Sequence, residues 1–234
     1  AYGPVQGVPR ILNMLDSFGL KATFFVPGVV ADKYPDVVKE IAARGHEIGF
    51  HGYFHEEFST TTCEQENATM ERCEKLIREL TGQQMVSHRA PGGVIHDYSL
   101  RLFMERGYIA SSNWRNSDGP FIHELDGVKI PLVEVPKDSI FDDTAYDFYT
   151  DSAPERYELK SPGEMLEIWK EEFDTLADEG RMINFVLHPQ FIGRVSRVNM
   201  LKELIGYMLS RGAWIDTNRA VAEWVLKESG MLSK

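Results

Sequence analysis

The chain has 234 residues, of which 43% are hydrophobic and 26% charged, a composition typical of a globular protein with a substantial core. Its 25 basic and 36 acidic residues give a net charge of −11, which argues against non-specific binding to nucleic acid or to anionic membranes. No apolar run approaches the roughly 20 residues that span a bilayer, and no signal peptide is evident, so we expect no membrane partner and a cytoplasmic location. Two cysteines ten residues apart on one expected helix are too distant to pair with each other, which fits a reducing compartment.

Taken in chain order, the sequence alternates expected helices with short apolar strands, and it opens on a helix rather than a strand. Six helices end at a glycine and pass within a few residues into a strand. The helices are expected at 9–19, 35–45, 61–82, 97–107, 161–180 and 196–212, with a last one from 218. The strands are expected at 22–26, 47–50, 85–89, 108–112, 132–135, 182–187 and 213–216.

Three helix starts carry capping signals. Thr61 and Glu64 form a candidate capping box, and Asp97 can cap the helix that follows it. Ser161, with Glu164 three residues later, forms a further box.

Two stretches lack periodicity. Residues 113–131 are polar and are interpreted as irregular. The segment 136–160 is too long for a simple connection and is expected to shape a binding site. We interpret its adjacent carboxylates, Asp142 and Asp143, as solvated.

The alternation of helices and strands predicts an α/β fold with parallel strands. Seven strands come close to a (β/α) barrel, whose working groups lie at the C-terminal ends of strands. Those ends carry His51, Arg89, His188 and Asp216. A doubly wound open sheet is the alternative architecture, but no glycine-rich phosphate loop follows any strand, so nucleotide binding is disfavoured.

Three histidines lie within ten residues of one another around the strand at 47–50. His51 and His55 are separated by four residues, so one helical turn would place both rings on one face, where two imidazoles can hold a divalent metal. A metal site needs at least one further ligand. His46 lies at the other end of the strand and is interpreted as structural, His88 is expected to point away from the site, and His96 and His123 are interpreted as solvated.

Three motifs, HEIGFHGYFH, SHRAPGG and NFVLHP, resemble in order and spacing those of the polysaccharide deacetylase (NodB-homology) family, carbohydrate esterase family four. The resemblance is closest to the unsecreted branch that contains the Helicobacter-type peptidoglycan deacetylase, cyclic imidases and allantoinases. It implies a distorted (β/α) barrel of seven or eight strands, with residues 1–234 as a single catalytic domain. In the family, one aspartate ligand and an aspartate base come from a D-x-D motif on the first strand. This sequence has no such strand. Either the strand precedes residue 1 in the full protein, or the barrel lacks it together with both aspartates, and we expect the first because a barrel without one strand would expose two edges.

The resemblance also implies roles for individual residues. His51 and His55 would bind a divalent metal, zinc or alternatively cobalt or nickel, and His188 would be the general acid. Arg89 would orient the aspartate base, and the backbone N–H of Tyr53 would stabilise an oxyanion. Phe191 and Arg194, which follow His188, and also Trp114 could line the substrate pocket.

We therefore predict a metal-dependent hydrolase of non-peptide carbon–nitrogen bonds that removes N-acetyl groups from amino sugars. The alternatives are a hydrolase of cyclic imide or ureide rings, which Gly52 after the first histidine favours, and a non-catalytic binding module of the same fold. The partner would be a glycan or small-molecule substrate, and a homo-oligomer is expected from the unsecreted branch.

Overall fold

The computed structural model describes residues 1–147 and 159–232. The chain forms two compact units. The helical unit comprises residues 1–20 and 137–215, and the sheet unit comprises residues 21–136 and 216–234. Among the described residues, no helix has both the length and the apolar character needed to cross a membrane.

A sheet in the order β1-β2-β3-β4-β6-β5 forms the centre of the sheet unit. Its neighbouring strands are parallel except β5, which is antiparallel to β6. The α/β class with a mainly parallel sheet is thus confirmed. The strands are β1 (Thr23–Val26), β2 (Glu47–Phe50), β3 (Ser87–His88), β4 (Ala110–Ser111), β5 (Phe121–Leu125) and β6 (Val128–Glu134).

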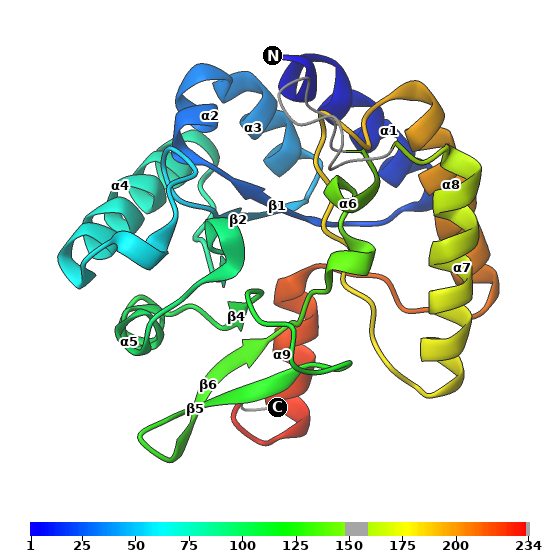
Figure 1. The fold of residues 1–234 in the computed structure, drawn as a ribbon. Coiled ribbons are helices and arrows are strands. Elements are labelled where there is room, and N and C mark those ends of the chain that lie inside the picture. The colour runs from blue at the N-terminus through cyan, green and yellow to red at the C-terminus, as the bar shows by residue number, and fades with distance from the viewer. Residues whose placement is uncertain (148–158, 233–234) are drawn as a thin grey trace. The chain divides into compact units, whose positions relative to one another are not determined.

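Helices of the sheet unit pack against this sheet. Figure 1 shows α3 and α4 beside β2, and α9 beside the β5–β6 hairpin. All four residues of β2 are buried, and neighbouring strands pair with both of its edges. The helices are α2 (Gly28–Lys33), α3 (Pro35–Ala43), α4 (Cys63–Thr81), α5 (Asp97–Glu105) and α9 (Asn218–Glu228), with short 3₁₀ turns at Phe58–Thr60 and Pro91–Gly93.

The helical unit is built on long helices and one isolated parallel bridge between Asp142 and Val186. Its core centres on Trp169, which is fully buried and donates its indole N–H to the carbonyl of Ile140 at 2.7 Å. The elements are a π-helical turn (Gly3–Gly7), α1 (Val8–Phe18), a 3₁₀ turn (Ser139–Phe141), α6 (Thr144–Asp147), α7 (Pro162–Asp178) and α8 (Val195–Ser210).

Helix ends follow the sequence signals closely in several places. Helix α1 ends at Gly19 with φ of +68°, and α7 has the predicted capping box, in which the Ser161 hydroxyl accepts from Glu164 N at 3.2 Å. The box at α4 is one residue later than predicted, at Thr62 and Gln65, because the hydroxyl of Thr61 donates to the preceding turn.

Other predictions require correction. Helix α5 is capped by His96, so Asp97 is its first helical residue rather than its cap. Helix α2 was not predicted. Within the described residues, 182–187 has only the bridge at Val186, and 213–216 forms no strand, since an apolar run becomes a strand only when a neighbouring strand pairs with it.

Residues 113–131 contain β5 and the start of β6, so the prediction of an irregular segment was wrong. The two strands are joined at Asp126 and Gly127, whose φ values of +53° and +76° are those of a type I′ hairpin turn. The Asp-Gly pair was therefore the available signal for this hairpin.

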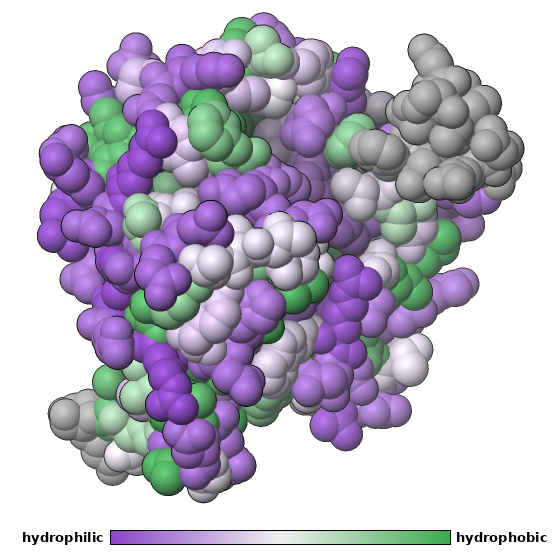
Figure 2. All heavy atoms as spheres, turned by 60° about the vertical axis from the view of Figure 1, so that its left-hand side comes forward, coloured by the Kyte–Doolittle hydropathy of each residue, from purple (hydrophilic) through white to green (hydrophobic). Residues whose placement is uncertain are grey.

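Hydrophilic side chains dominate the face shown in Figure 2, where hydrophobic residues occur only in small groups. This distribution accords with the net charge of −11.

Gly49 in β2 provides a test of the packing of the sheet. A Cβ added there would lie 2.6 Å from the ring of Phe25 and 3.0 Å from the carbonyl oxygen of Ser87, and the second contact is with backbone that cannot swing aside. We expect Gly49→Ala to lower the free energy of unfolding by about 1–3 kcal/mol, measured by urea denaturation. Gly119→Ala, where the added methyl would meet nothing within 4 Å, is the control. Equal stability of the two variants would contradict the packing described.

Candidate functional site

His51 and His55 lie on a loop that directly follows β2. Their ring centroids are 4.8 Å apart and the ring planes are inclined at 83°. The predicted helical turn is absent: residues 51–55 are not helical, and the chain turns through Gly52 and His55, with φ values of +68° and +63°. The left-handed conformation is costly at a non-glycine residue and concentrates at functional sites. The two rings are therefore adjacent, as predicted, but through a tight loop.

The orientation of the His51 ring is fixed by its neighbour on the next strand. The Nδ1 atom lies 2.7 Å from the carbonyl oxygen of Arg89. Because a carbonyl can only accept, Nδ1 carries the hydrogen and the lone pair of the neutral ring lies on Nε2. Metal-binding histidines characteristically donate their second ring N–H in this way. The donor set of His51 and His55 thus fits a divalent metal.

Two imidazoles alone do not complete a metal site, since a catalytic zinc takes three protein ligands. Among the described residues, the group with at least three potential ligands is Asp142, Asp143 and His188, and it includes neither His51 nor His55. The histidine pair therefore supplies two ligands of a site that takes a third.

Glu56 organises the loop between the histidines. Its carboxylate accepts the backbone N–H of Tyr53 at 3.0 Å and that of Phe54 at 2.7 Å. The N–H that was expected to stabilise an oxyanion is therefore bound to a carboxylate in this structure, and an oxyanion would have to displace Glu56 to reach it. The ring of Phe54 is 71% exposed, which places an apolar surface beside the two histidines.

The side chain of Tyr53 anchors the same loop. Its hydroxyl donates to the carboxylate of Asp32, a contact that raises the pKa of the Tyr53 phenol, and the guanidinium of Arg72 lies 3.4 Å from the ring centroid. Tyr53 thus fixes the loop through two contacts: its hydroxyl donates to Asp32 and its backbone N–H donates to Glu56.

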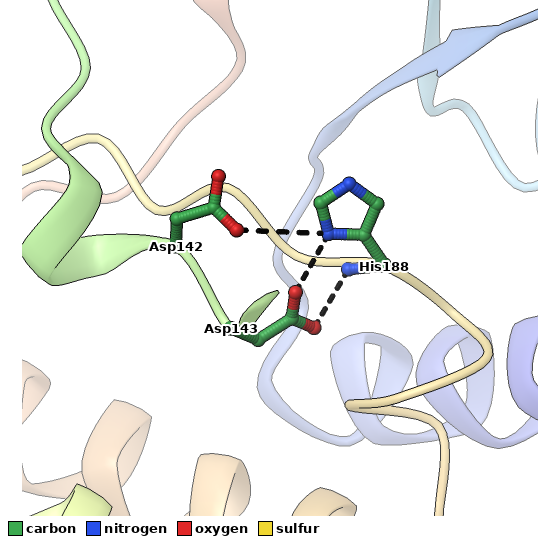
Figure 3. A group of neighbouring side chains, drawn as sticks. All are labelled: Asp142, Asp143 and His188. Carbon is green, nitrogen blue, oxygen red and sulfur yellow. Dashed lines mark hydrogen bonds and ion pairs between the residues drawn. The ribbon is translucent and has the colours of Figure 1, made fainter. Parts of the chain in front are cut away.

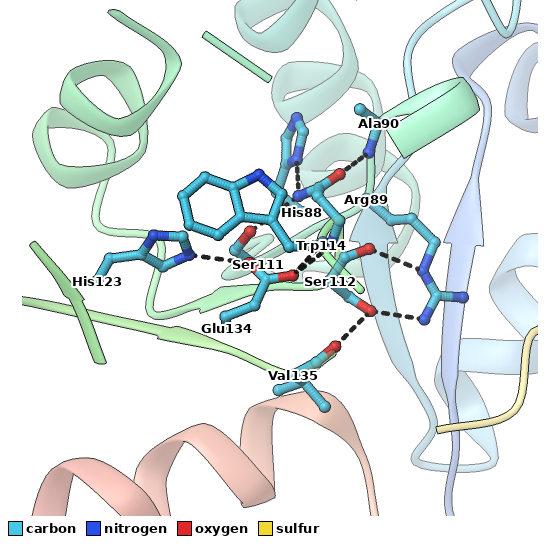
Figure 4. A network of polar contacts seen from close by, with 10 residues as sticks. His88, Arg89, Ala90, Ser111, Ser112, Trp114, His123, Glu134 and Val135 are labelled. Carbon is cyan, nitrogen blue, oxygen red and sulfur yellow. Dashed lines mark hydrogen bonds and ion pairs between the residues drawn. The ribbon is translucent and has the colours of Figure 1, made fainter. Parts of the chain in front are cut away.

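Arg89 follows β3 and is buried. Its guanidinium donates to the Ser112 hydroxyl at 2.7 Å and to the Ser112 carbonyl at 3.3 Å, and it lies 4.4 Å from the ring centroid of Phe25. Ser112 in turn donates to the carbonyl of Val135 at 2.9 Å (Figure 4). The arginine is consequently held in one position.

A buried polar network lies beside Arg89 (Figure 4). At its centre, the Glu134 carboxylate accepts from Trp114 N at 2.7 Å and pairs with His123 Nε2 at 2.8 Å. Asn113 connects it to the arginine motif, since its side-chain oxygen accepts from Ala90 N at 2.7 Å. The solvated interpretation of His123 was wrong, because the ring is 1% exposed and satisfies a buried carboxylate.

The remaining histidines are structural. His46 Nδ1 accepts from Ala22 N, as the structural interpretation predicted. His88 is fully buried among aromatic rings, 4.1 Å from the ring centroid of Phe103, and burial holds its pKa well below the ordinary value. His96 is half-buried, with a ring nitrogen 3.0 Å from the carbonyl of Phe58, so its solvated interpretation was also wrong.

His188 forms a close pair with Asp143 in the helical unit (Figure 3). Its Nδ1 lies 2.6 Å from Asp143 Oδ1, and its backbone N donates to Oδ2 at 2.7 Å. The bridge between Asp142 and Val186 brings these two segments together. Asp143 is fully buried, so its interpretation as a solvated carboxylate was wrong. Burial raises the pKa of Asp143, and the contacts with His188 oppose that rise.

Asp143 can orient His188 for proton transfer. It accepts the Nδ1 hydrogen and thereby fixes the tautomer, while the second ring nitrogen points away from both carboxylates (Figure 3). Asp142 is more distant, with Oδ1 3.9 Å from Nδ1, and it accepts instead from Thr144. The three residues lie close enough to bind a metal ion, but both oxygens of Asp143 already accept N–H groups of His188. The arrangement therefore favours an oriented acid over a metal site.

Asp147 lies one helical turn from Asp143 and forms an ion pair with Arg197. Burial raises the pKa of Asp147 to about 6, although Arg197 opposes the rise. This folded-state pKa lies above the value of about 3.9 for an aspartate in the unfolded chain. The protonated carboxyl therefore stabilises the fold fully below about pH 4, and this stabilisation is lost as the pH rises through about 6.

We expect Asp147→Asn to remove this pH-dependent loss of stability, because an asparagine side chain cannot ionise. The unfolding free energy, from urea denaturation at several pH values, should fall less between pH 4 and 7 in the variant than in the wild type. Asp36→Asn, at an exposed carboxylate, should keep the wild-type pH dependence. The same dependence in Asp147→Asn would refute this assignment.

The turn after His188 carries the other predicted substrate contacts. The ring of Phe191 is half-buried, with its centroid 6.1 Å from that of His188. Arg194 is exposed and donates through Nε to the carbonyl of Gln190 at 3.3 Å. Within each unit the predicted residues gather: His51, His55, Tyr53 and Arg89 in the sheet unit, and His188, Phe191 and Arg194 in the helical unit.

Comparisons with known proteins agree with these features. A family model described as polysaccharide deacetylase matches residues 2–110. The peptidoglycan deacetylase of Helicobacter pylori is 24% identical over 249 residues, which cover 95% of this chain and 85% of that protein. The crystal structure of a Mycobacterium smegmatis protein assigned to the polysaccharide deacetylases is 30% identical, with a TM-score of 0.92 over 98% of this chain and 80% of that one. The PuuE allantoinase is 26% identical, with a TM-score of 0.81 over 95% of this chain and 72% of that one.

The fold, the histidine groups and these similarities define a hydrolase that acts on carbon–nitrogen bonds other than peptide bonds. The chain belongs to the polysaccharide deacetylase family.

Proposed function

We propose that this hydrolase removes N-acetyl groups from amino sugars with the help of a divalent metal. The observation that carries the proposal is the pairing of His51 with His55, in which the carbonyl of Arg89 fixes the His51 tautomer so that its lone pair lies on Nε2. We further propose that residues 1–234 form a single catalytic domain.

A divalent ion bound by His51 and His55 would supply Lewis-acid chemistry, polarising the amide carbonyl and making water more acidic. The other steps belong to side chains. Protonated at Nε2, His188 would deliver that proton to the leaving nitrogen. Asp143 would hold the ring in place and stabilise its positive charge. Arg89, fixed by Ser112, would orient the aspartate base that the D-x-D motif of the family supplies and that takes the proton of the attacking water.

The similarity to the peptidoglycan deacetylase of Helicobacter pylori supports a glycan substrate. The exposed ring of Phe54 beside the histidine pair supports it further, because an aromatic face can pack against a sugar ring. Phe191 and Trp114 are further candidates for substrate contacts. Tyr53 N–H would serve the oxyanion only if Glu56 leaves it.

A second candidate activity is the hydrolysis of a ureide or cyclic imide ring. The similarity to the PuuE allantoinase and the presence of Gly52 after the first histidine favour it. At Gly52 the φ of +68° strains any other residue, and an added Cβ would lie 2.9 Å from a carboxylate oxygen of Glu56, which would have to shift. A serine or threonine hydroxyl is therefore absent at this point of the loop.

One assay separates these activities. The protein, supplied with zinc, is incubated with N-acetylglucosamine oligosaccharides and in parallel with allantoin and a cyclic imide such as dihydrouracil. We expect acetate release from the oligosaccharides and no ring opening. Ring opening without acetate release would establish the second activity instead, and sugar binding without turnover of any substrate would indicate a binding module.

The metal, the location and the assembly are also proposals. Zinc is preferred for two imidazole ligands, with cobalt or nickel as alternatives. Cys63 and Cys73 are both free, which supports a cytoplasmic location that cell fractionation can test. A homo-oligomer is proposed, and light scattering at several protein concentrations would detect it.

A further inference from the structure

In the helical unit, the guanidinium groups of two arginines lie against the same tyrosine ring. The guanidinium carbon of Arg194 lies 4.0 Å from the ring centroid of Tyr2, and that of Arg10 lies 5.8 Å from it. Arg10 also donates to the Tyr2 hydroxyl at 2.7 Å. Cation–π contacts of this kind restrict the movement of a guanidinium. Tyr2, Arg10 and Arg194 are called the arginine cluster below.

The backbone beneath the cluster is tightly packed. A Cβ added at Gly7 would lie 2.1 Å from the carbonyl oxygen of Pro189, and one at Gly193 would lie 2.4 Å from the Cα of Gly7. Arg10 donates to the Gly193 carbonyl at 3.2 Å. The first helical turns of the chain are therefore pressed against the segment 189–193.

That segment directly follows His188. The carbonyl of His188 accepts from the backbone N of Phe191 at 2.8 Å and of Ile192 at 3.0 Å, and the carbonyl of Phe191 accepts from Arg194 N at 3.1 Å. A single compact turn thus connects the proposed acid to Arg194. From this connection we infer that a substrate bound at His188 can extend to the arginine cluster.

The cluster has no acidic partner among residues 1–147 and 159–232, which the structure describes. No carboxylate in those ranges lies within 4 Å of Arg10 or Arg194, and the two guanidiniums donate to neutral oxygens, those of Tyr2, Gln6, Gln190 and Gly193. In the same unit, Arg197 and Arg211 are each paired with aspartates. Two arginines that lie against one ring, with no carboxylate partner in the described part of the chain, therefore form a local positive site in a chain where acidic residues outnumber basic ones, 36 to 25.

We propose that the arginine cluster is an anion subsite, and that the substrate is an N-acetylated sugar carrying a carboxylate close to its acetamido group. This inference rests on the proposed deacetylase function and narrows its substrate class. A guanidinium binds a carboxylate through two parallel hydrogen bonds, and the Tyr2 ring holds Arg194 in advance of binding. Arg194 is exposed and provides the direct contact, while Arg10 and Tyr2 position it.

The test compares two substrates that differ in the lactyl group that carries the carboxylate. Oligosaccharides that present N-acetylmuramic acid carry a lactyl carboxylate, and the matching N-acetylglucosamine oligosaccharides do not. We expect Arg194→Gln to lower kcat/KM for the carboxylate substrate about 10- to 100-fold, mainly through KM, and to change the value for the neutral substrate less than about twofold. Arg181→Gln, at an exposed arginine paired with Glu179, is the matched control and should affect neither substrate.

Equal effects of Arg194→Gln on the two substrates, or no effect on either, would overturn the inference. If the wild type releases acetate from neither substrate, the proposed function has failed and calorimetric titration with N-acetylmuramic acid decides the subsite separately. Binding that Arg194→Gln weakens would support an anion subsite. No binding, or binding of equal strength to the variant, would refute it.

Discussion

Replacing His188 by alanine should lower kcat about 10²- to 10⁴-fold, the range that general acid catalysis contributes. The loss follows because the leaving nitrogen would depart without the proton that Nε2 of His188 is proposed to donate. The side chain is half-buried and its main partner is Asp143, so the fold should tolerate the change. Acetate release from N-acetylglucosamine oligosaccharides under steady-state conditions is the measurement.

Two companion variants separate orientation of the ring from simple structural damage. Asp143→Asn leaves only one acceptor for the two N–H groups of His188, so kcat should fall while KM changes little. Asp142→Asn is the matched control, since its carboxylate lies 3.9 Å from Nδ1 and should matter much less. Equal losses in the two aspartate variants, or wild-type kcat in His188→Ala, would contradict the assigned roles.

The second large effect is expected at the histidine pair. His51→Ala or His55→Ala should abolish stoichiometric metal binding and reduce acetate release to background, because a single imidazole leaves the ion without one of its protein ligands. His55 is exposed, so its removal should not affect the fold, which circular dichroism can verify. Elemental analysis of the purified protein gives the metal content.

The neighbouring Phe54 offers the control for this experiment. Phe54→Ala removes an exposed side chain of the same loop without removing a ligand, so the metal content should stay at the wild-type level. A histidine variant that retains its metal, or a Phe54 variant that loses it, would show that the ion is bound elsewhere.

Local signals in the sequence were sufficient for much of the fold. The end of α1 at Gly19 and the capping box at Ser161 depend on residues within one turn of each other, so sequence spacing identifies them. The same holds for β2, whose bounds were predicted and whose C-terminal end places His51. The adjacency of His51 and His55 also follows from their spacing, although a tight loop rather than a helix produces it.

Long-range pairs were the part that the sequence did not reveal. Asp143 and His188 are 45 residues apart, and no local pattern distinguishes a buried carboxylate from a solvated one. The bridge between Asp142 and Val186 aligns the two segments in space. Glu56 was missed for a different reason, since a carboxylate that accepts backbone N–H groups two and three residues earlier resembles an ordinary surface glutamate in sequence.

The β5–β6 hairpin shows how buried polar residues obscure a strand. His123 on β5 and Glu134 on β6 are almost fully buried, so alternation of apolar and polar residues does not mark these strands. Each side chain provides a hydrogen-bond partner for the other, so the two polar groups can be buried without a large loss of stability. The Asp126 and Gly127 turn was the stronger signal here.

The most direct test of the central claim is acetate release from N-acetylglucosamine oligosaccharides before and after removal of bound metal by a chelator. We predict that activity disappears with the metal, returns in the wild type when zinc is added, and does not return in His55→Ala. Deacetylation that persists in the metal-free protein, or that zinc restores equally in His55→Ala, would contradict a metal-dependent deacetylase that uses this histidine pair.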